Sequence, residues 1–465
     1  MSLPEKFIER TKALLGGDEY MALQSAIGGE SSVSIRMNRQ KWNGEGENMI
    51  PVPWCENGYY LEGRYTFTFD PLFHAGCYYV QEASSMFLSR VMRQYVDEAS
   101  VMLDLCAAPG GKSTLARTLL PNGSLLVSNE VMRNRAQVLA ENITKWGNPN
   151  VVVTNSDPSE FTPLESVFDV ILTDVPCSGE GMFRKDEVAV QEWSEDNVYM
   201  CAERQRKILR DIWPCLKSGG LLIYSTCTYN REENEDNVEW ICNELGGEVL
   251  PVDVDEAWKI TGNLVGGDFP VYRFMPHKTK GEGLFMAVVR KTSEDEQATV
   301  MRKRAKDKKK QKNAKPVAVP RDMKELLAHK DEFAFVVENS LLSAFPSAYV
   351  DFYSQLKDTV HVIHAGITVA ELKGKDWQPS HSLAMSTEYV RGSYPEVEVD
   401  YTQALAYLRR ESVVLPSDVS RGYVLLTYKG VALGFVKNIG NRANNLYPQE
   451  WKIRSGYLPA DLKIL

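Results

Sequence analysis

Two cysteines and one aspartate stand where apolar, strand-like runs of this sequence end. Asp174 and Cys177 follow one such run, and Cys227 follows the next. A thiolate is a strong nucleophile and a carboxylate can hold a proton, so the three groups would suit covalent catalysis with proton transfer. More often a cysteine is a small buried apolar residue. We interpret four others in that way: Cys106, Cys201, Cys215 and Cys242. Cys177 and Cys227 differ because each lies at a strand-to-loop transition with no apolar period around it.

Residues 101–116, VMLDLCAAPGGKSTLA, have the pattern of a strand, a glycine turn and a helix that begins near Lys112. Such a turn directs backbone N–H groups and the positive end of a helix at a ligand. It is not a Walker A loop, because Cys106 stands five residues before Gly111, where that loop needs glycine. The G-x-G-x-x-G spacing of dinucleotide-binding turns is absent as well. Taken alone, the stretch also fits a plain tight turn.

Two acidic residues follow further strand-like runs. Glu130 comes after the run at 124–129, and an acid at that place commonly binds the two hydroxyls of a ribose. Asp157 comes after the run at 151–154, where it would reach the edge of an adenine. Both acids also fit ordinary helix N-cap or turn positions, so each has a structural interpretation beside the functional one.

The elements that must position these residues alternate between strands and helices. The strand-like runs are apolar throughout, as expected when both faces of a sheet are covered. The alternation predicts an α/β fold with a doubly wound, mostly parallel sheet, whose ligands bind at the carboxyl ends of the strands. The predicted strands are 101–105, 124–129, 151–154, 168–173, 220–226 and 284–290, and the predicted helices are 112–120, 131–146, 197–217 and 232–245.

The rest of the chain divides around this domain. Residues 1–96 predict a small N-terminal α+β module that binds RNA, with helices in 4–27, strand-like alternation at 32–36 and 59–70, and a helix that ends near 96. The catalytic domain then covers 97–292. Residues 293–320 predict a basic linker, either a solvated tether or one that touches RNA. Two small modules follow at 321–390 and 391–465, the second with a hairpin signal at 423–437.

Composition limits the class of protein. Residues 1–300 hold 28 Lys and Arg against 44 Asp and Glu, whereas residues 301–465 hold 25 against 18, so the C-terminal part is the better partner for a polyanion. No run is apolar enough to span a bilayer and no signal peptide precedes the first module, which predicts a cytoplasmic protein without a membrane partner. The eight cysteines show neither C-x-x-C nor a Cys/His cluster, so we expect no disulfide framework and no metal site.

Together these motifs resemble the Nol/Nop/Sun family of S-adenosylmethionine-dependent RNA cytosine-5 methyltransferases. Five ordered motifs in one chain are far more specific than any one of them. The resemblance covers roughly residues 30–291, and Val175 stands where the family usually has a small residue. The matching pieces are LDLCAAPGGKS, Glu130, NSD ending at Asp157, LTDVPCSGEGMFRKD and IYSTCTYNREENE, with YVQEASSM before the domain and EGLFMAVVRK at its end.

This resemblance implies a Rossmann-like methyltransferase fold and a role for each site residue. Cys227 would attack carbon 6 of the target cytosine, Asp174 would hold the proton on ring nitrogen 3, and Cys177 would help to release the product. Glu130 would bind the ribose of S-adenosylmethionine and Asp157 its adenine. The methionine part would lie against Cys106, Ala107, Ala108, Pro109, Gly110, Gly111 and Lys112, with Asp174 beside it. The target base must leave its stack to reach this pocket, and Arg184 and Lys185 nearby fit either phosphate contacts or a solvated face.

The C-terminal sequence LLTYKGVALGFVKNIGNRANNLYPQEWKIR resembles the PUA-like tail of bacterial RsmF-type rRNA methyltransferases. Its basic and aromatic residues suit RNA backbone contacts and stacking, although the aromatics fit a core equally well. They are Lys429, Lys437, Arg442, Lys452 and Arg454, with Tyr428, Tyr447 and Trp451. This resemblance implies a monomer that acts on 16S rRNA or the 30S subunit, at a decoding-region cytosine.

Three other functions compete with this one. The same chemistry on tRNA would leave every motif unchanged. A non-catalytic RNA-binding or ribosome-assembly factor of the same fold would need neither cysteine nor Asp174. A nicotinamide-dependent dehydrogenase is disfavoured by the missing glycine fingerprint.

Overall fold

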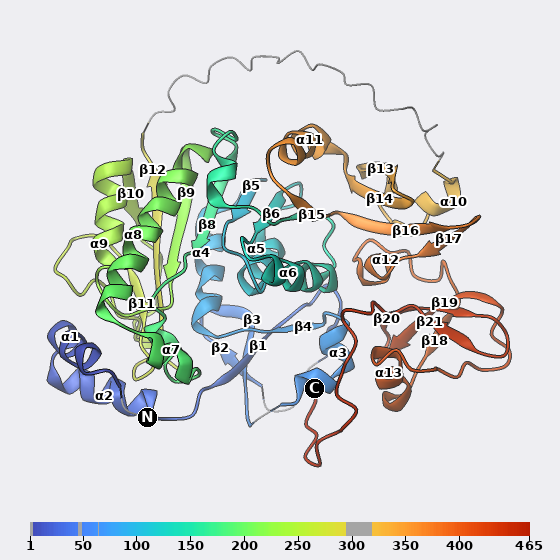
Figure 1. Ribbon diagram of the computed structural model, residues 1–465, viewed down its shortest axis with the longest axis horizontal. Coiled ribbons are helices and arrows are strands. Elements are labelled where there is room, and N and C mark those ends of the chain that lie inside the picture. Colours follow the sequence, from blue (N-terminus) through green and yellow to red (C-terminus); the bar gives the residue numbers. More distant parts are fainter. Residues whose placement is uncertain (1–2, 45–48, 64, 294–318) are drawn as a thin grey trace.

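The computed structural model describes residues 3–44, 49–63, 65–293 and 319–465, and a nine-stranded sheet forms its centre (Figure 1). The strand order is β10-β12-β9-β8-β5-β6-β7-β15, with β11 paired to β12. The five strands from β9 to β7 are parallel, and the outer strands on both sides are antiparallel. The predicted α/β class with a mostly parallel, doubly wound centre is therefore confirmed. Of the predicted basic linker, residues 293–320, the stretch 294–318 lies outside the described residues.

All six strands predicted for the catalytic domain are present. Three further strands of the sheet, β10, β11 and β15, were not predicted, and β15 comes from far beyond the catalytic domain. The bounds are β5 (Val101–Asp104), β6 (Leu125–Asn129), β7 (Val151–Thr154), β8 (Phe168–Asp174), β9 (Leu216–Thr226), β10 (Gly247–Leu250), β11 (Tyr272–Phe274), β12 (Leu284–Lys291) and β15 (Val362–Ala365).

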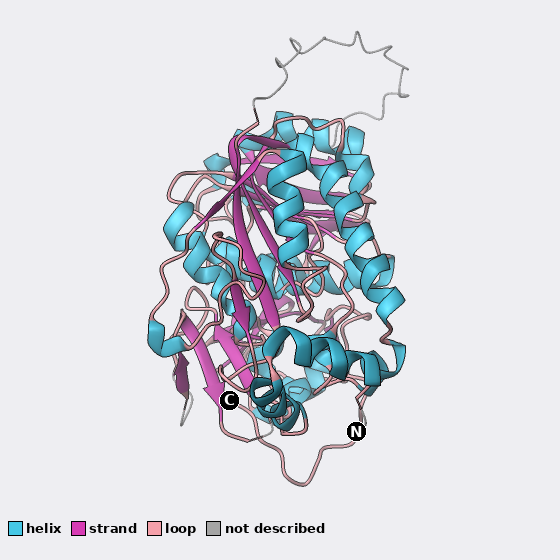
Figure 2. Cartoon of the chain, turned by 90° about the vertical axis from the view of Figure 1, so that its left-hand side faces the viewer, coloured by secondary structure: helices cyan, strands magenta, loops and turns pink. Residues whose placement is uncertain are grey.

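Helices cover both faces of this sheet, which explains why its central strands are apolar on both sides (Figure 2). One face packs against α4 (Leu88–Tyr95), α5 (Gly111–Leu119) and α6 (Arg133–Trp146). The other face packs against α8 (Glu195–Ile212), α9 (Glu235–Trp240) and α11 (Val350–Thr359). The last of these helices belongs to the C-terminal part of the chain.

The N-terminal module has a helical hairpin and a four-stranded antiparallel sheet in the order β2-β3-β1-β4. One expectation is wrong here. The alternation at 59–70 does not form one strand, because β3 stops at Leu61 before Gly63, which has a φ of +82°, and residues 67–69 form a 3-10 turn. The bounds are α1 (Glu5–Leu15), α2 (Gly17–Ile27), β1 (Val33–Met37), β2 (Ile50–Val52), β3 (Cys55–Leu61), α3 (Pro71–His74) and β4 (Tyr78–Val80).

Two more sheets follow residue 319, in the orders β13-β14-β16-β17 and β18-β19-β20-β21. The predicted hairpin is confirmed as β19 and β20, and Lys429 and Gly430 both take a positive φ, as a tight hairpin turn requires. The bounds are α10 (Arg321–Lys324), β13 (Phe333–Glu338), β14 (Leu341–Pro346), β16 (Ile367–Lys373), β17 (Asp376–Pro379), α12 (His381–Met385), β18 (Glu396–Glu398), α13 (Tyr401–Leu408), β19 (Gly422–Tyr428), β20 (Val431–Asn438) and β21 (Ala443–Asn445). A short helix, α7 (Glu187–Glu192), precedes α8 in the catalytic domain.

Apolar cores join parts of the chain that lie far apart in sequence. Ile35 and Tyr78 of the N-terminal sheet pack in one cluster with Leu405 and Leu426 of the last module. Figure 1 shows this last module beside α3, with the C-terminus close to the N-terminal sheet. The modules therefore stabilise one another, since the exposure of either would uncover apolar surface of its partner.

Candidate active site

The structure brings Cys177 and Cys227 together at the carboxyl ends of two adjacent parallel strands. Their sulfur atoms lie 3.1 Å apart, and the backbone N–H of Cys227 donates to the sulfur of Cys177 at 3.4 Å. Both side chains are half-buried. The hydrogen bond with Cys227, together with burial, raises the pKa of Cys177 well above the usual range of a thiol. Cys177 thus keeps its proton at neutral pH and can donate it toward its neighbour.

Asp174 ends β8 beside this pair, and both of its carboxylate oxygens accept hydrogen bonds. Lys112 donates to one oxygen at 2.8 Å, and the hydroxyl of Ser225 donates to the other at 2.8 Å. Burial works against the charge on Lys112, but the carboxylate of Asp174 outweighs it and raises the pKa of the lysine. The site therefore holds a fixed ion pair next to two thiols.

Two buried glutamates that the sequence analysis did not single out connect the loops that carry the cysteines. Glu180, 2% exposed, accepts from the backbone N–H of Tyr229 at 2.8 Å and from that of Asn230 at 2.9 Å. Glu233 accepts from the backbone N–H of Ser178 at 3.0 Å and from the side-chain amide of Asn230 at 2.7 Å. Burial raises the pKa of Glu233 to about 7, although these donors oppose the shift. Both glutamates lie inside the quoted motifs, so the sequence shows that they are near the cysteines. It does not show which groups they contact.

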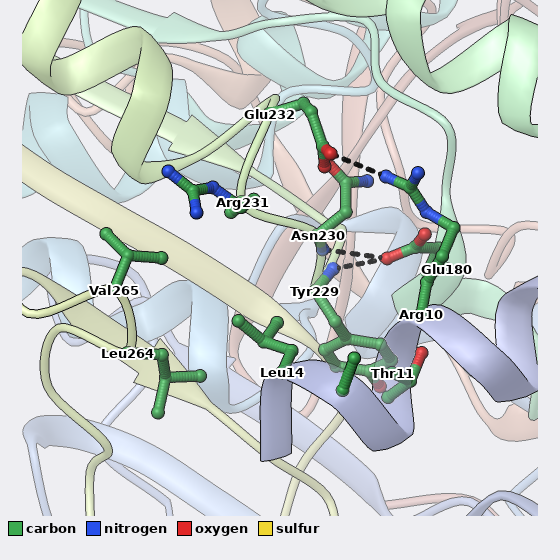
Figure 3. A pocket seen from close by; sticks show the side chains of 11 residues that line it. Arg10, Thr11, Leu14, Glu180, Tyr229, Asn230, Arg231, Glu232, Leu264 and Val265 are labelled. Atoms are coloured by element: carbon green, nitrogen blue, oxygen red, sulfur yellow. Dashed lines mark hydrogen bonds and ion pairs between the residues drawn. The ribbon is translucent and has the colours of Figure 1, made fainter. Parts of the chain in front are cut away.

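Helix α1 supports the back of the same loop (Figure 3). Arg10 forms ion pairs at 2.7 Å with Glu232 of the loop and at 2.7 Å with Glu195 of α8. A cavity of about 350 Å³ lies between α1 and the loop, with Leu14, Leu264 and Val265 on its apolar side. The N-terminal helices thus contact the segment that carries Cys227 from behind.

The residues predicted to hold the methionine part of a cofactor lie in one loop between β5 and α5. Gly110 takes a φ of +113°, and α5 begins at Gly111. The carbonyls of Ala108 and Pro109 accept from Arg135 at 3.0 Å and from Asn142 at 2.8 Å, which fixes this side of the loop. Burial raises the pKa of Cys106, in agreement with its interpretation as an unreactive thiol.

Asp104, at the end of β5, is another residue that the sequence analysis did not single out, as with Glu180 and Glu233. It is fully buried, and one oxygen accepts from Ser113 at 2.6 Å. Within the described part of the chain its other oxygen has no hydrogen-bond partner, and burial raises its pKa to about 7. An unpaired buried acceptor beside this loop fits a ligand that carries an ammonium group or other donor.

Glu130 and Asp157 lie at the ends of the neighbouring strands β6 and β7. Glu130 is buried and accepts from the backbone N–H of Met132 at 2.9 Å. Asp157 is exposed and caps a 3-10 turn, where hydrogen bonds from Ser159 lower its pKa. The structural interpretation of Asp157 therefore holds, and its exposed position leaves a ligand contact open.

Val131 and Met132 follow Glu130 and are 51% and 58% exposed. Exposed apolar side chains next to a buried acid suit the flat face of a purine beside its ribose. The acceptor oxygens of Asp104 and Glu130 and this apolar surface are the kinds of groups that could hold a nucleoside cofactor.

Comparisons with known proteins identify the family of this chain. Family models match residues 3–83 (N-terminal domain of 16S rRNA methyltransferase RsmF), 92–290 (16S rRNA methyltransferase RsmB/F) and 394–453 (methyltransferase RsmF PUA domain). Ribosomal RNA small subunit methyltransferase F of Aliivibrio fischeri is 30% identical over 98% of this chain and 98% of its own length. The protein of that name from Vibrio parahaemolyticus is 29% identical over 96% and 97%.

The chain belongs to the RsmF family of 16S rRNA methyltransferases.

Solved structures show where the likeness of the fold ends. A methyltransferase homolog protein from Pyrococcus horikoshii matches with a TM-score of 0.53 and 27% identity, over 62% of this chain and 95% of its own. NSun6 from Pyrococcus horikoshii with SFG matches with a TM-score of 0.53 and 21% identity, over 63% and 99%. Both neighbours are nearly covered, whereas more than a third of this RsmF-family chain has no counterpart in either.

The C-terminal part of this RsmF-family chain contacts the edge of the sheet on which the candidate site lies. Strand β15 pairs antiparallel with β7. The backbone N–H of Asn155 donates to the carbonyl of His361 at 2.9 Å, and the N–H of His361 donates to the hydroxyl of Ser156 at 3.0 Å. The side chain of Asn155 in turn donates to the carbonyl of Glu130 at 2.7 Å. A segment some 200 residues away in sequence therefore supports the loop next to Asp157.

Several residues considered as RNA contacts are buried in the structure. Arg184 is buried against Glu282, so it is not a free phosphate ligand. Tyr447 is fully buried, Tyr428 is buried and Trp451 is half-buried, which confirms the core interpretation for the first two aromatics. Across the residues that the structure describes, no helix meets the length and hydropathy of a membrane span, and no group of His, Cys, Asp and Glu has metal-site geometry.

Proposed function

We propose that this RsmF-family chain methylates carbon 5 of cytosine in 16S rRNA with S-adenosylmethionine, by covalent cysteine catalysis. The observation that carries the proposal is the pair of sulfur atoms 3.1 Å apart beside the Lys112–Asp174 ion pair. A binding factor has no need for two thiols held at contact distance next to a carboxylate.

Carbon 5 of cytosine is a poor nucleophile until a thiolate adds to carbon 6. Cys227 forms that sulfur–carbon bond, and the electron pair of the broken 5,6 double bond makes carbon 5 nucleophilic. The proton that the Cys227 thiol loses passes to ring nitrogen 3, where the carboxylate of Asp174 accepts a hydrogen bond from it, so the new negative charge on the ring is balanced. When bound, S-adenosylmethionine supplies the methyl group that carbon 5 takes.

Product release restores the double bond. The proton on carbon 5 leaves, the electron pair re-forms the 5,6 bond, and the bond to the sulfur of Cys227 breaks. Cys177, 3.1 Å from that sulfur, gives its own proton to the departing Cys227 sulfur and takes the proton that carbon 5 loses, and the proton on ring nitrogen 3 is lost to solvent. Glu180 and Glu233 hold the two loops in register throughout, because each accepts backbone N–H groups from a cysteine loop.

The cofactor is held by this chain's own loop residues. Glu130 binds the ribose hydroxyls and Asp157 the adenine edge, with Val131 and Met132 against the purine. Cys106 to Lys112 line the methionine part, and Asp104 offers its unpaired oxygen to the amino group. The chain acts as a monomer on 16S rRNA or the 30S subunit. It does so in the cytoplasm, where ribosomal subunits are made.

The test is transfer of a labelled methyl group to unmethylated 30S subunits, naked 16S rRNA and tRNA in parallel, followed by nucleoside analysis. We expect 5-methylcytosine in the 30S or 16S samples. Label in tRNA alone would keep the chemistry and replace the substrate. Bound S-adenosylhomocysteine with no transfer to any RNA would support the assembly-factor alternative.

A further inference from the structure

A second cavity, of about 310 Å³, lies between the N-terminal module and the loop that follows β8. We call it the N-terminal pocket. One wall comes from the chain just before and within β1, a second from the segment after β3, and the floor from the residues after β4. The residues used below are Ser31, Tyr65, Phe67, Gln81, Glu82 and Lys185.

The floor of this pocket is the back of the candidate active site. Arg36 donates to the side chain of Gln81 at 2.8 Å and to the carbonyl of Gly111 at 3.3 Å, so the floor and the cofactor loop share one buried cation. A Cβ added to Gly111 would lie 3.5 Å from the Gln81 side chain. The pocket is therefore separated from the cofactor loop by a single side chain.

The pocket is equally close to the nucleophile loop. Glu82, on the floor, accepts the backbone N–H of Glu282 at 2.8 Å. The next residue, Gly283, packs against Gly181, where an added Cβ would lie 2.8 Å from both the Cα of Gly283 and the carbonyl oxygen of Cys227. The floor of the pocket therefore binds the segment that packs against the backbone of Cys227.

The walls combine two kinds of chemistry. Tyr65 and Phe67 are stacked, with ring centroids 6.0 Å apart and an interplanar angle of 12°, and both are half-buried. Lys185 stands at the mouth with its side chain 30% exposed. Lys185 forms an ion pair with Glu282 at 3.6 Å, but Glu282 also accepts a hydrogen bond from Arg184 at 2.8 Å. Because Arg184 already binds this carboxylate, Lys185 can still bind a further anion.

We propose that the N-terminal pocket binds one nucleotide of single-stranded RNA next to the target nucleotide, with the base against Tyr65 and Phe67 and its phosphodiester at Lys185. This inference rests on the proposed function. A lone ammonium matches the single charge of a phosphodiester better than the multiple charges of a free nucleotide. Aromatic side chains and neutral hydroxyls are the groups with which proteins bind unpaired bases.

The test compares three variants of the full chain. Ser31→Trp fills the pocket from an exposed loop position, and Lys185→Ala removes its cation. Lys217→Ala is the matched control, because Lys217 stands near the start of β9, at the end opposite Cys227. We expect the KM for the RNA substrate to rise about tenfold in both pocket variants, with kcat and S-adenosylhomocysteine affinity as in wild type.

Salt dependence separates RNA contact from a structural effect. Lys185→Ala should lower the slope of log affinity against log salt by about one, and Ser31→Trp should leave the slope unchanged. Wild-type KM and slope in both pocket variants would overturn the proposal. If the wild-type chain transfers no methyl group, the proposed function fails. The same variants are then compared by direct RNA titration, and unchanged affinity there would overturn the pocket as well.

Discussion

The two halves of the active-site edge are built in different ways. The reactive end, at the tips of β8 and β9, contains Asp174, Cys177 and Cys227, and its supports come from the same two motifs. Glu180 and Glu233 lie within six residues of a cysteine. The other end, at the tips of β6 and β7, contains Glu130 and Asp157, and we call it the adenosine end after its proposed role. Its outer support is the backbone of His361, in a different module.

If the proposed function is right, chemistry and cofactor placement depend on separate parts of the chain. Changes at the reactive end should alter catalysis without altering the cofactor site. Changes in the C-terminal part should alter the cofactor site without altering the groups of the reactive end.

Cys227→Ala removes the attacking sulfur at the reactive end. We expect methyl transfer to fall about a thousandfold or more, as for loss of a nucleophile in other covalent enzymes, with S-adenosylhomocysteine affinity unchanged in calorimetry. Cys242→Ala, a half-buried cysteine outside the site, is the matched control. Activity retained in Cys227→Ala would remove this residue from the mechanism.

Cys177→Ala leaves attack possible but removes the thiol that assists release. We expect a covalent protein–RNA adduct to accumulate on denaturing gels when S-adenosylmethionine is present. The Cys177→Ala, Cys227→Ala double variant should form none, because the bond to RNA runs through Cys227. A single variant without an adduct would show that Cys177 has another role.

We expect acid to weaken the contact between the N-terminal module and the C-terminal modules, where His74 and His381 are buried. Burial, together with the positive charge of Lys145 beside both, lowers the pKa of His74 and of His381 to about 3. Because unfolded histidine titrates near 6.5, stability is full above that pH and falls as the pH drops, by up to about 1.4 kcal/mol per pH unit for each histidine. Lys41 also faces His381, and Tyr447 lies against both histidines.

Urea unfolding at pH 7 and pH 5 measures this effect. We expect His381→Leu to reduce the loss of unfolding free energy between the two pH values, whereas His361→Ala, at an exposed histidine, keeps the wild-type loss. Equal losses in all three proteins would show that the buried histidines are not the cause.

His361→Pro removes the N–H that donates to Ser156 at the adenosine end. One hydrogen bond is worth about 1 kcal/mol, so S-adenosylhomocysteine affinity should weaken by about fivefold. His361→Ala keeps the backbone N–H and should bind as wild type. A loss in the alanine variant instead would assign the contact to the imidazole ring.

Much of the site was predictable because its residues follow contiguous strand patterns. Cys177, Cys227 and Asp174 were expected at neighbouring strand ends, and the structure places them there. Their roles, and those of Glu130 and Asp157, stay predictions. Glu180 and Glu233 were not predictable as supports, because hydrogen bonds to backbone N–H groups leave no period in the sequence.

Six of the nine strands of the central sheet, the order of its strands and helices along the chain, and the edge on which the site lies follow from the sequence. Apolar runs and glycine turns are local signals, and the carboxyl ends of parallel strands must share an edge. Only the tertiary structure decided that β15 completes this sheet and that the first and last modules share a core. Those contacts join segments hundreds of residues apart, whose short half-buried strands would fit many partners until the surrounding apolar surfaces select one.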